Sequence, residues 1–424
     1  MVTADLGMAR KALGAACAEV RESPFPEALP GPPFMEALPE SADEAAAVMR
    51  VAAEHELAVV VRGGGSRLAW GTPPSRCDLV IDTSMMSGVV EHASGDLVAR
   101  VRAGARMGDV AAVLAQAGQE IALDVPDEAT VGGVVASGLA GPRRLRYGTP
   151  RDLLIGIAIV RADGTIAKSG GKVVKNVAGY DLGKLFAGSA GTLGLITEAI
   201  FRLHPLPAAR AYVTAEYVAV PVACNAVAAA ANSPLVSSAV ELSRAEPGGP
   251  ARVGVLLEGS VDGVAARSAR MADLLGTGQV AADPPAWWPG ALRAGSGETL
   301  IRVSFWVSAL GRVLDAIEAA AGKAEVAPAI EGSAGAGVLY IRPGADADTD
   351  RPGAVAEFIA LLRAAVAGAR CAVVVLAAPG AVRSELATRG GMSGVVPGLA
   401  LMRAVKDRFD PGHRMAPGRF PDTA

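Results

Sequence analysis

Short runs of apolar residues alternate with polar turns along the first half of the chain, and they predict an α+β fold. Ser41 followed by Glu44 is typical of a capping box and predicts a helix to about His55. Asp163-Gly164 predicts a β-hairpin, and Gly118 ends a second helix that begins near Met107 and runs to Ala117. The β-branched runs predict strands at Leu57 to Val61, Leu79 to Asp82, Leu97 to Val101, Leu153 to Arg161 and Thr165 to Lys168.

After His204-Pro205-Leu206-Pro207 the pattern becomes strand, helix, strand, strand, helix, which predicts a ferredoxin-like sheet with helices on one face. These elements are Tyr212 to Val218, Val222 to Ala231, Val236 to Leu242, Arg252 to Glu258 and Val261 to Leu275. A second round follows at Thr299 to Val307, Leu310 to Ala321, Val338 to Ile341, Ala354 to Ala367 and Cys371 to Ala377, and a last helix at Leu399 to Phe409. We therefore expect four parts: 1–35, a helix and Pro-rich connector; 36–206, a first domain; 207–394, a second domain; and 395–424, a helix and tail that return to the first domain.

The composition excludes several classes of protein. A chain of 424 residues with a formal charge of −3 has no basic field to hold nucleic acid. The longest uncharged run, Tyr217 to Val240, is interrupted by Pro221, Asn225 and Pro234, so no transmembrane segment is expected. The first residues lack the apolar run of a signal peptide, which leads us to expect a cytoplasmic protein.

Metal chemistry has little support in the sequence. The four cysteines lie far apart and the four histidines show no metal-ligand spacing, so neither an Fe–S cluster nor a structural zinc is expected. Isolated buried thiols and ordinary histidines are the simpler interpretation.

Glycine-rich segments are the main candidates for a binding site. Arg62-Gly63-Gly64-Gly65-Ser66 follows a strand but lacks the spacing of a Rossmann fingerprint, and no Walker A loop is present. Its consecutive N–H groups suit a diphosphate, although a tight solvent turn remains the alternative. Two further segments, 126–148 and 170–197, contain small residues that let a backbone lie against a flat ligand. For Gly188, Gly191 and Gly194 the alternative is close helix packing, because they recur at helical spacing.

Taken together and in this order, these segments resemble the flavin domain of the vanillyl-alcohol-oxidase type, also called the PCMH-type FAD-binding domain. Within that family they are most similar to the FAD-binding subunits of glycolate oxidase. The resemblance covers about residues 36–206, and its most specific part is Lys175 to Asp181. It implies a two-lobed FAD-binding domain followed by a ferredoxin-like α+β cap domain.

The resemblance also implies the residues that bind FAD. The diphosphate loop would be Arg62, Gly63, Gly64, Gly65 and Ser66. The residues that lie beside the diphosphate and the flavin would be Pro126, Thr130, Val131, Gly132, Gly133, Ser137 and Gly138. The adenosine part of FAD would contact Gly191 and Ile196. Arg302 resembles a family arginine that holds the substrate anion, with an ordinary surface arginine as the alternative.

The sequence departs from the family pattern in three places. Ala416 stands where relatives carry Asn before Pro417-Gly418, which removes a hydrogen bond from that turn. The Gly loop holds no histidine for a covalent link, so the resemblance implies non-covalent FAD. Residues 207–394 contain no histidine, and thus no obvious general base.

Three functions stay open at this stage. The first is an FAD-dependent oxidoreductase subunit that oxidises glycolate or another small 2-hydroxy acid, with a second flavin subunit and an Fe–S subunit as partners. Such partners would place a cytoplasmic protein at the periphery of the inner membrane. The second is a non-catalytic FAD-bearing electron-transfer or assembly subunit, and the third is a stand-alone flavin-dependent alcohol or hydroxy-acid oxidase. The hydroxy acid, the electron acceptor and the catalytic base are not specified by the sequence.

Overall fold

The computed structural model describes residues 6–22, 29, 31, 35–172, 180–276, 278–290, 292, 294–295 and 297–419. Contacts divide the chain into two units. The first unit comprises Met1–Leu139, Thr149–Leu206 and Pro397–Pro421, and the second comprises Ala140–Gly148, Pro207–Val396 and Asp422–Ala424. The segment Ala140–Gly148 thus leaves the first unit in mid-sequence and belongs to the second.

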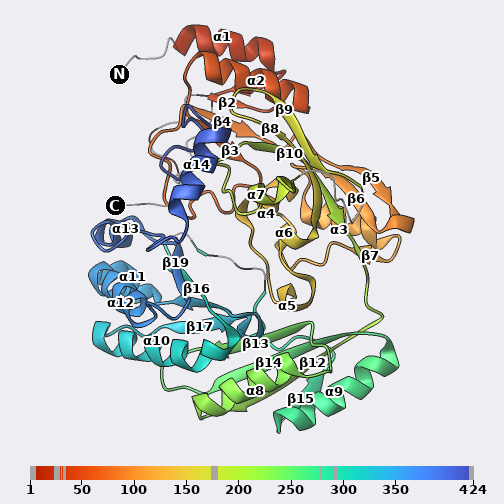
Figure 1. Ribbon diagram of the computed structural model, residues 1–424, viewed down its shortest axis with the longest axis vertical. Helices are drawn as coiled ribbons and strands as arrows, with labels where there is room; N and C mark the ends of the chain where they lie inside the picture. The colour runs from red at the N-terminus through yellow and green to blue at the C-terminus, as the bar shows by residue number, and fades with distance from the viewer. Residues whose placement is uncertain are drawn as a thin grey trace. The chain divides into compact units, whose positions relative to one another are not determined.

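A four-stranded sheet opens the first unit, in the order β1-β2-β4-β3 (Figure 1). Its strands are Val20–Arg21 (β1), Met35–Ala37 (β2), Val59–Arg62 (β3) and Leu79–Asp82 (β4), and the two helices beside it are Leu6–Ala16 (α1) and Ala42–Glu54 (α2). The predicted cap is confirmed, because the Ser41 side chain accepts a hydrogen bond from the N–H of Glu44. The carboxylate of Glu44 accepts from the N–H of Glu40 and not from that of Ser41. Only half of the capping box therefore forms as predicted.

A five-stranded antiparallel sheet completes the first unit, in the order β5-β6-β10-β8-β9. Its strands are Val89–Ala93 (β5), Val98–Arg102 (β6), Leu154–Val160 (β8), Ile166–Gly170 (β9) and Leu195–Arg202 (β10). Gln119–Glu120 (β7) pairs with His204–Pro205 (β11), and the helices are Met107–Ala115 (α3), Val131–Ser137 (α4), Pro150–Leu153 (α6) and Gly183–Phe186 (α7). The hairpin at Asp163-Gly164 is confirmed, with Gly164 at φ +79°. The strands β5 and β10 were not predicted from the sequence.

The second unit is built on an eight-stranded antiparallel sheet in the order β15-β12-β14-β13-β17-β18-β16-β19. Its strands are Ala209–Tyr217 (β12), Ala239–Arg244 (β13), Ala251–Gly259 (β14), Gln279–Ala281 (β15), Leu300–Ser304 (β16), Ala329–Gly332 (β17), Val338–Arg342 (β18) and Ala372–Ala377 (β19). Within each half, the strands numbered along the chain lie in the order 4-1-3-2 of a βαββαβ unit. The two halves join through β13 and β17.

Helices cover one face of this sheet (Figure 1). They are Val220–Asn232 (α8), Val261–Leu275 (α9), Leu310–Ala324 (α10) and Pro352–Ala365 (α12). The second unit also contains the shorter helices Arg144–Tyr147 (α5), Ala345–Asp350 (α11) and Gly380–Ala387 (α13). Val240 and Leu242 of β13 belong to the core under the helices, so Glu241 between them points to the opposite face. That opposite face, here called the polar face, carries most of the charged side chains of the sheet; Arg244 is an exception, because it pairs with Glu318 of α10 on the helix side.

The C-terminal segment closes the first unit. After helix Leu399–Phe409 (α14), Met415 lies beside Val59 in a parallel bridge. The N–H of Val59 donates to the carbonyl of Arg414, and the N–H of Ala416 donates to that of Val59. Among the described residues, no helix is long and apolar enough to cross a membrane.

Candidate functional site

The loop after β3 forms an open backbone cradle. A Cβ added to Gly64 would lie 2.9 Å from the carbonyl oxygen of Glu128, and one added to Gly63 would overlap the Thr130 side chain. Gly65 adopts φ +76°, a conformation that favours glycine. Within the described part of the chain, the N–H groups of Gly64, Gly65 and Ser66 donate no hydrogen bond. The loop therefore rests on residues 128–130 and offers exposed N–H groups on its other side.

Arg62 holds this loop to the sheet through its side chain. Its guanidinium pairs with the fully buried carboxylate of Glu36 and, at 2.6 Å, with that of Asp82. Its carbonyl accepts a hydrogen bond from the N–H of Thr83. Because both carboxylates already neutralise the guanidinium, Arg62 positions the loop by its side chain and is left to meet a ligand only by its backbone.

The second glycine segment lies directly against the first. The Thr130 hydroxyl accepts from the N–H of Gly133 at 3.3 Å and so caps α4. The N–H of Gly132 donates to the carbonyl of Ala103 at 2.7 Å, and a Cβ on Gly132 would meet that alanine. Val131 donates to Ala105, and Pro126 is buried, so this predicted segment is fixed against β6 and the start of α3.

The third segment meets the end of α4. The N–H of Gly188 donates to the carbonyl of Val135, and a Cβ on Gly138 would lie 3.0 Å from the backbone of Gly188. Gly188 and Gly191 have φ +86° and +75° in a loop before β10, so the alternative of glycines in a packed helix is wrong. Ile196 is buried on β10. The structure thus brings the Gly loop, residues 126–139 of the second segment and residues 180–197 of the third together in the first unit, whereas residues 140–148 belong to the second unit.

The most family-specific stretch, Lys175 to Asp181, lies mostly outside the described residues, which resume at 180. On either side of that gap, the side chains face solvent. Tyr180 is 91% exposed, and Lys172 pairs with Glu91 at 2.5 Å.

Arg67, the residue directly after the Gly loop, is a cation near this site. Its guanidinium donates to the hydroxyl of Ser137 at 3.2 Å and lies 5.4 Å from the ring centroid of Trp70. It therefore links the residue that follows the Gly loop to the C-terminal end of α4. The signal in the sequence was a positive charge directly after the loop, which suits an anionic ligand.

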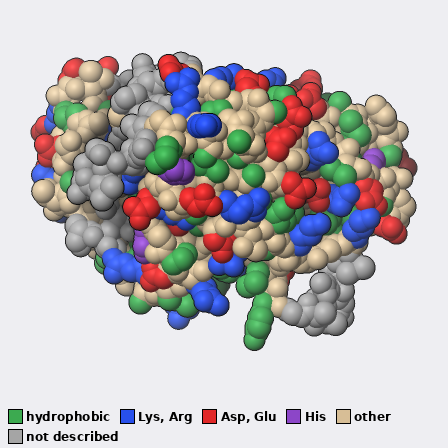
Figure 2. Space-filling view, turned by 90° about the horizontal axis from the view of Figure 1, so that it is seen from above, with side chains coloured by type: hydrophobic (Ala, Val, Ile, Leu, Met, Phe, Trp, Pro, Cys, Tyr) green, Lys and Arg blue, Asp and Glu red, His purple; other side chains and the backbone are tan. Residues whose placement is uncertain are grey.

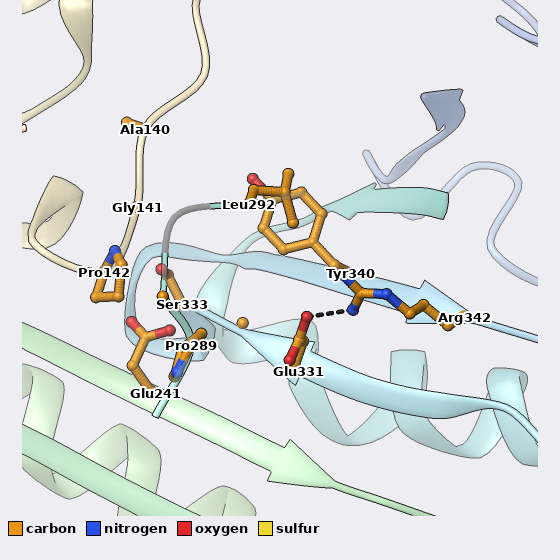
Figure 3. A pocket seen from close by; sticks show the side chains of 12 residues that line it. Ala140, Gly141, Pro142, Glu241, Pro289, Leu292, Glu331, Ser333, Tyr340 and Arg342 are labelled. Carbon is orange, nitrogen blue, oxygen red and sulfur yellow. Dashed lines mark hydrogen bonds and ion pairs between the residues drawn. The ribbon is translucent and has the colours of Figure 1, made fainter. Parts of the chain in front are cut away.

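In the second unit, the polar face carries a row of side chains across neighbouring strands. Ser243 lies opposite Glu331, Glu331 opposite Tyr340, and Tyr340 opposite Arg302. Beside this row is a cavity of about 220 Å³, with Tyr340 and the Glu331–Arg342 ion pair on its wall (Figure 3). It is lined by Ala140, Gly141, Pro142, Glu241, Pro289, Gly290, Leu292, Glu331, Gly332, Ser333, Tyr340 and Arg342.

Arg302 is an unusual member of this row. Its Nε atom is buried without a hydrogen-bond partner, and among the described residues its guanidinium makes no ion pair. Burial lowers the pKa of Arg302, nearby Tyr340 raises it, and nearby Arg144 lowers it further. A partly buried cation without a carboxylate is costly, which marks a place where an anion would be stabilised.

The segment Ala140–Gly148 is fixed on the same polar face. Arg144 donates to the hydroxyl of Tyr340 at 2.9 Å, and Tyr147 donates to the carboxylate of Glu258 at 3.2 Å. Glu258, only 1% exposed, also pairs with Arg210 at 2.9 Å and lies 3.6 Å from Arg143. Burial, followed by the charge of Glu258, raises the pKa of Tyr147.

Two other classes of site find no support. Figure 2 shows Lys and Arg mixed with Asp and Glu over the face that it draws, without a continuous basic patch. Across the described ranges, no group of three or more His, Cys, Asp or Glu side chains is arranged to hold a metal ion.

Comparison with protein families and curated proteins finds similarity in the first unit. Residues 33–170 match the family described as FAD binding domain. The GlcD subunit of glycolate oxidase from Bacillus subtilis is 36% identical over 191 residues, which are 45% of this chain and 41% of the relative. The GlcE subunit from Escherichia coli is 39% identical over 154 residues, 36% of this chain and 43% of the relative. D-lactate dehydrogenase from Archaeoglobus fulgidus is 36% identical over 177 residues, 41% of this chain and 39% of that protein. The chain thus spans less than half the length of these relatives.

Solved structures resemble almost the whole chain in fold. p-Cresol methylhydroxylase with substrate bound has a TM-score of 0.72 at 14% identity, covering 99% of this chain and 97% of that one. Alkyldihydroxyacetonephosphate synthase has a TM-score of 0.66 at 15% identity, covering 92% of this chain and 76% of that one. At such identities the likeness shows a shared fold alone.

Proposed function

We propose that residues 33–170, which match the family described as FAD binding domain, hold FAD, and that the protein is an FAD-dependent oxidoreductase acting on a small 2-hydroxy acid such as glycolate or D-lactate. The observation that carries this proposal is the packing of the Gly loop on residues 128–130, which leaves the N–H groups of Gly64, Gly65 and Ser66 without a hydrogen-bond acceptor in the described part of the chain. The names of the relatives, glycolate oxidase subunits and a D-lactate dehydrogenase, support the substrate class.

The residues present fit FAD. A Cβ would collide with residues 128–130 at Gly63 and Gly64, so only glycine lets the loop lie there with its N–H groups outward. Gly63 to Ser66 would hold the diphosphate by those N–H groups, and Arg67 adds a positive charge beside them. FAD supplies a two-electron acceptor, and the chain's role is to bind and orient it.

We expect the FAD to be bound without a covalent link, because the loop 62–66 contains no histidine. Acid precipitation of the purified protein should leave yellow flavin in the supernatant. Flavin that stays in the protein pellet would contradict this.

Arg302 is the candidate for holding the substrate carboxylate. Its guanidinium on the polar face has no carboxylate partner among the described residues, whereas the neighbouring Arg342 is paired with Glu331. A guanidinium binds a carboxylate through two parallel hydrogen bonds, which a lysine does not reproduce.

The test is anaerobic mixing of the purified protein with glycolate or D-lactate, followed by flavin absorbance. Bleaching supports the proposal, and Arg302→Met should abolish it without reducing FAD content. Arg312→Met, an exposed arginine of α10, is the matched control and should behave as wild type. No bleaching by any 2-hydroxy acid, alone or with partners, would contradict the proposal.

A second candidate is an FAD-bearing subunit that needs partners for chemistry. Similarity to both GlcD and GlcE supports a complex with a second flavin subunit, and single-electron transfer would require an Fe–S subunit. Purification of the native complex and identification of its subunits tests this. Bleaching in the complex but not in the single chain would favour the second candidate.

A further inference from the structure

We propose that Arg419, near the end of the C-terminal segment, binds the diphosphate of FAD and supplies the positive charge that the Arg62 side chain does not provide. This inference rests on the proposed function, because it names a further residue of the same cofactor site. Every residue used in the argument belongs to the first unit, so the inference is independent of the second unit.

The first step is the path by which the C-terminal segment reaches the Gly loop. The N–H of Ala416 donates to the carbonyl of Val59 on β3, the strand that leads into the loop. A turn follows, in which the N–H of Arg419 donates to the carbonyl of Ala416 at 3.1 Å. The N–H of Ser75 donates to the carbonyl of Pro417 at 2.6 Å. The backbone before Arg419 is therefore fixed both to β3 and to the segment that follows the Gly loop.

The second step is the contact between the Arg419 side chain and the loop. Its Nη2 atom donates to the carbonyl of Leu68 at 2.5 Å. The N–H of Leu68 donates to the carbonyl of Gly65 at 3.1 Å, which closes a turn over residues 65–68. The same turn contains the N–H groups of Gly65 and Ser66, which donate no hydrogen bond within the described part of the chain. The guanidinium thus lies at one end of the turn that offers donors to a ligand.

The third step is the balance of charge. Glu36 and Asp82 already neutralise Arg62, whereas Arg419 makes no ion pair among the described residues, and its Nε atom is buried without a hydrogen-bond partner. Burial lowers the pKa of Arg419 to about 10, which still leaves the side chain charged at neutral pH. The nearby Cys77 thiol does not balance this charge, because burial raises its pKa to about 12. A partly buried guanidinium of this kind is costly unless an anion approaches it.

The fourth step is the chemistry of the ligand. Backbone N–H groups offer a diphosphate hydrogen bonds but only partial positive charges. A guanidinium adds a full charge and donors that match the oxygens of a phosphate. Apart from its bond to Leu68, Arg419 donates no hydrogen bond to the described residues, so Nη1 is left for a phosphate oxygen. Arg419 would therefore complete the cradle that the loop begins.

The experiment measures the Kd of FAD by dilution of the FAD-loaded full chain, with the fluorescence of released flavin as the readout. Arg419→Gln keeps a donor for the carbonyl of Leu68 but removes the charge, whereas Arg419→Lys keeps both. We expect the Kd to rise roughly ten- to a hundredfold in Arg419→Gln and to stay within about fivefold of wild type in Arg419→Lys.

Arg414→Gln is the matched control. Arg414 lies in the same segment, and its Nη2 atom also donates to a backbone carbonyl, at 2.9 Å, but that carbonyl belongs to Ala162 and not to the Gly loop. Its Nη1 atom is buried without a hydrogen-bond partner, so the two substitutions disturb the fold in a similar way. Arg414→Gln should keep the Kd of wild type. An equal rise in both variants would overturn the inference, because it would then reflect lost stability.

ADP separates the diphosphate from the flavin, since it carries the adenosine and diphosphate of FAD without the ring system. Its Kd follows from the concentration that displaces FAD. The Kd of ADP should rise in Arg419→Gln by the same factor as the Kd of FAD. An unchanged Kd of ADP would overturn the inference, because Arg419 would then act on the flavin part of the site.

Two further results would overturn the inference and leave the proposed function standing. One is an FAD Kd in Arg419→Gln equal to that of wild type, and the other is an equal loss in Arg419→Gln and Arg419→Lys, which would show that the charge is not what matters. If wild type binds FAD but no 2-hydroxy acid bleaches it, the proposed substrate class fails and this inference stands. A wild-type chain that binds no FAD would refute both.

Discussion

Gly63 and Thr130 are in such close contact that the threonine side chain occupies the space where a Cβ of residue 63 would be. Since the same Thr130 hydroxyl caps α4, the Gly loop, residue 130 and the helix form one rigid support. A substitution in the loop therefore changes the binding site at two places.

Gly64→Val should abolish FAD binding while leaving the second unit folded. The reason is steric: the Cβ would lie 2.9 Å from the carbonyl oxygen of Glu128 and push the loop off its support. A positive φ is not the cause, because among the three glycines of the loop only Gly65 adopts that conformation. Flavin absorbance per purified chain measures the effect. Gly95→Ala, at a site with no atom within 4 Å of the added carbon, should bind FAD normally, and retained flavin in Gly64→Val would refute the prediction.

Lys406→Met should destabilise the first unit by about 3–5 kcal/mol, because it leaves a buried carboxylate without its cation. The ammonium of Lys406 donates to Asp410 at 2.6 Å and to the carbonyls of Thr192 and Met415, and Asp410 is fully buried. Urea unfolding measures the loss. The double variant Lys406→Met/Asp410→Asn should recover part of it, and a single variant as stable as the control Lys323→Met would contradict the prediction.

Ala416→Gly should stabilise the protein. Ala416 adopts φ +43°, in the left-handed region where Asn and Gly are favoured. The left-handed cost of about 1–2 kcal/mol exceeds the added chain entropy of about 0.4–1 kcal/mol, for a net gain of about 0.5–1 kcal/mol. Thermal or urea unfolding tests this, with Ala58→Gly expected to destabilise. A lower stability of Ala416→Gly would show that the turn is not strained.

Asp348→Asn should raise the stability of the second unit at neutral pH and not in acid. Burial raises the pKa of Asp348, against hydrogen bonding from Thr299, so the folded state binds this proton more tightly than the unfolded state. The protonated Asp348 thus contributes to the free energy of unfolding at acid pH. This contribution is lost as the pH rises from the usual pKa of a carboxyl group through the raised pKa of Asp348. Unfolding midpoints of wild type and variant should converge near pH 3 and separate toward pH 7. Equal midpoints at every pH, or a parallel shift in exposed Asp346→Asn, would contradict this.

The features that sequence predicts well are those fixed by neighbours along the chain. Ser41 caps its helix, Asp163-Gly164 turns its hairpin, and the glycines at 63–65 lie in a loop directly after a strand. Each depends on residues within a few positions, where backbone preferences act.

Features that depend on distant partners were not predictable in the same way. Strand β17 is short and joins the two halves of the sheet by pairing with β13, nearly ninety positions earlier. The role of the Arg62 side chain follows from Glu36, and that of Arg144 follows from Tyr340, 196 residues away. The residue pattern of a single segment does not predict contacts with distant residues. For this reason the Arg62 side chain was expected to face the ligand.

The bridge between Val59 and Met415 has a consequence for biosynthesis. A ribosome adds about 5–20 residues per second, so roughly 20–70 s pass between the emergence of β3 and of the segment that completes its hydrogen bonding. During that interval the edge of β3 is unpaired, and the strand that carries the cofactor loop lacks its final neighbour. An unfinished chain would therefore expose this edge to chaperones or to aggregation.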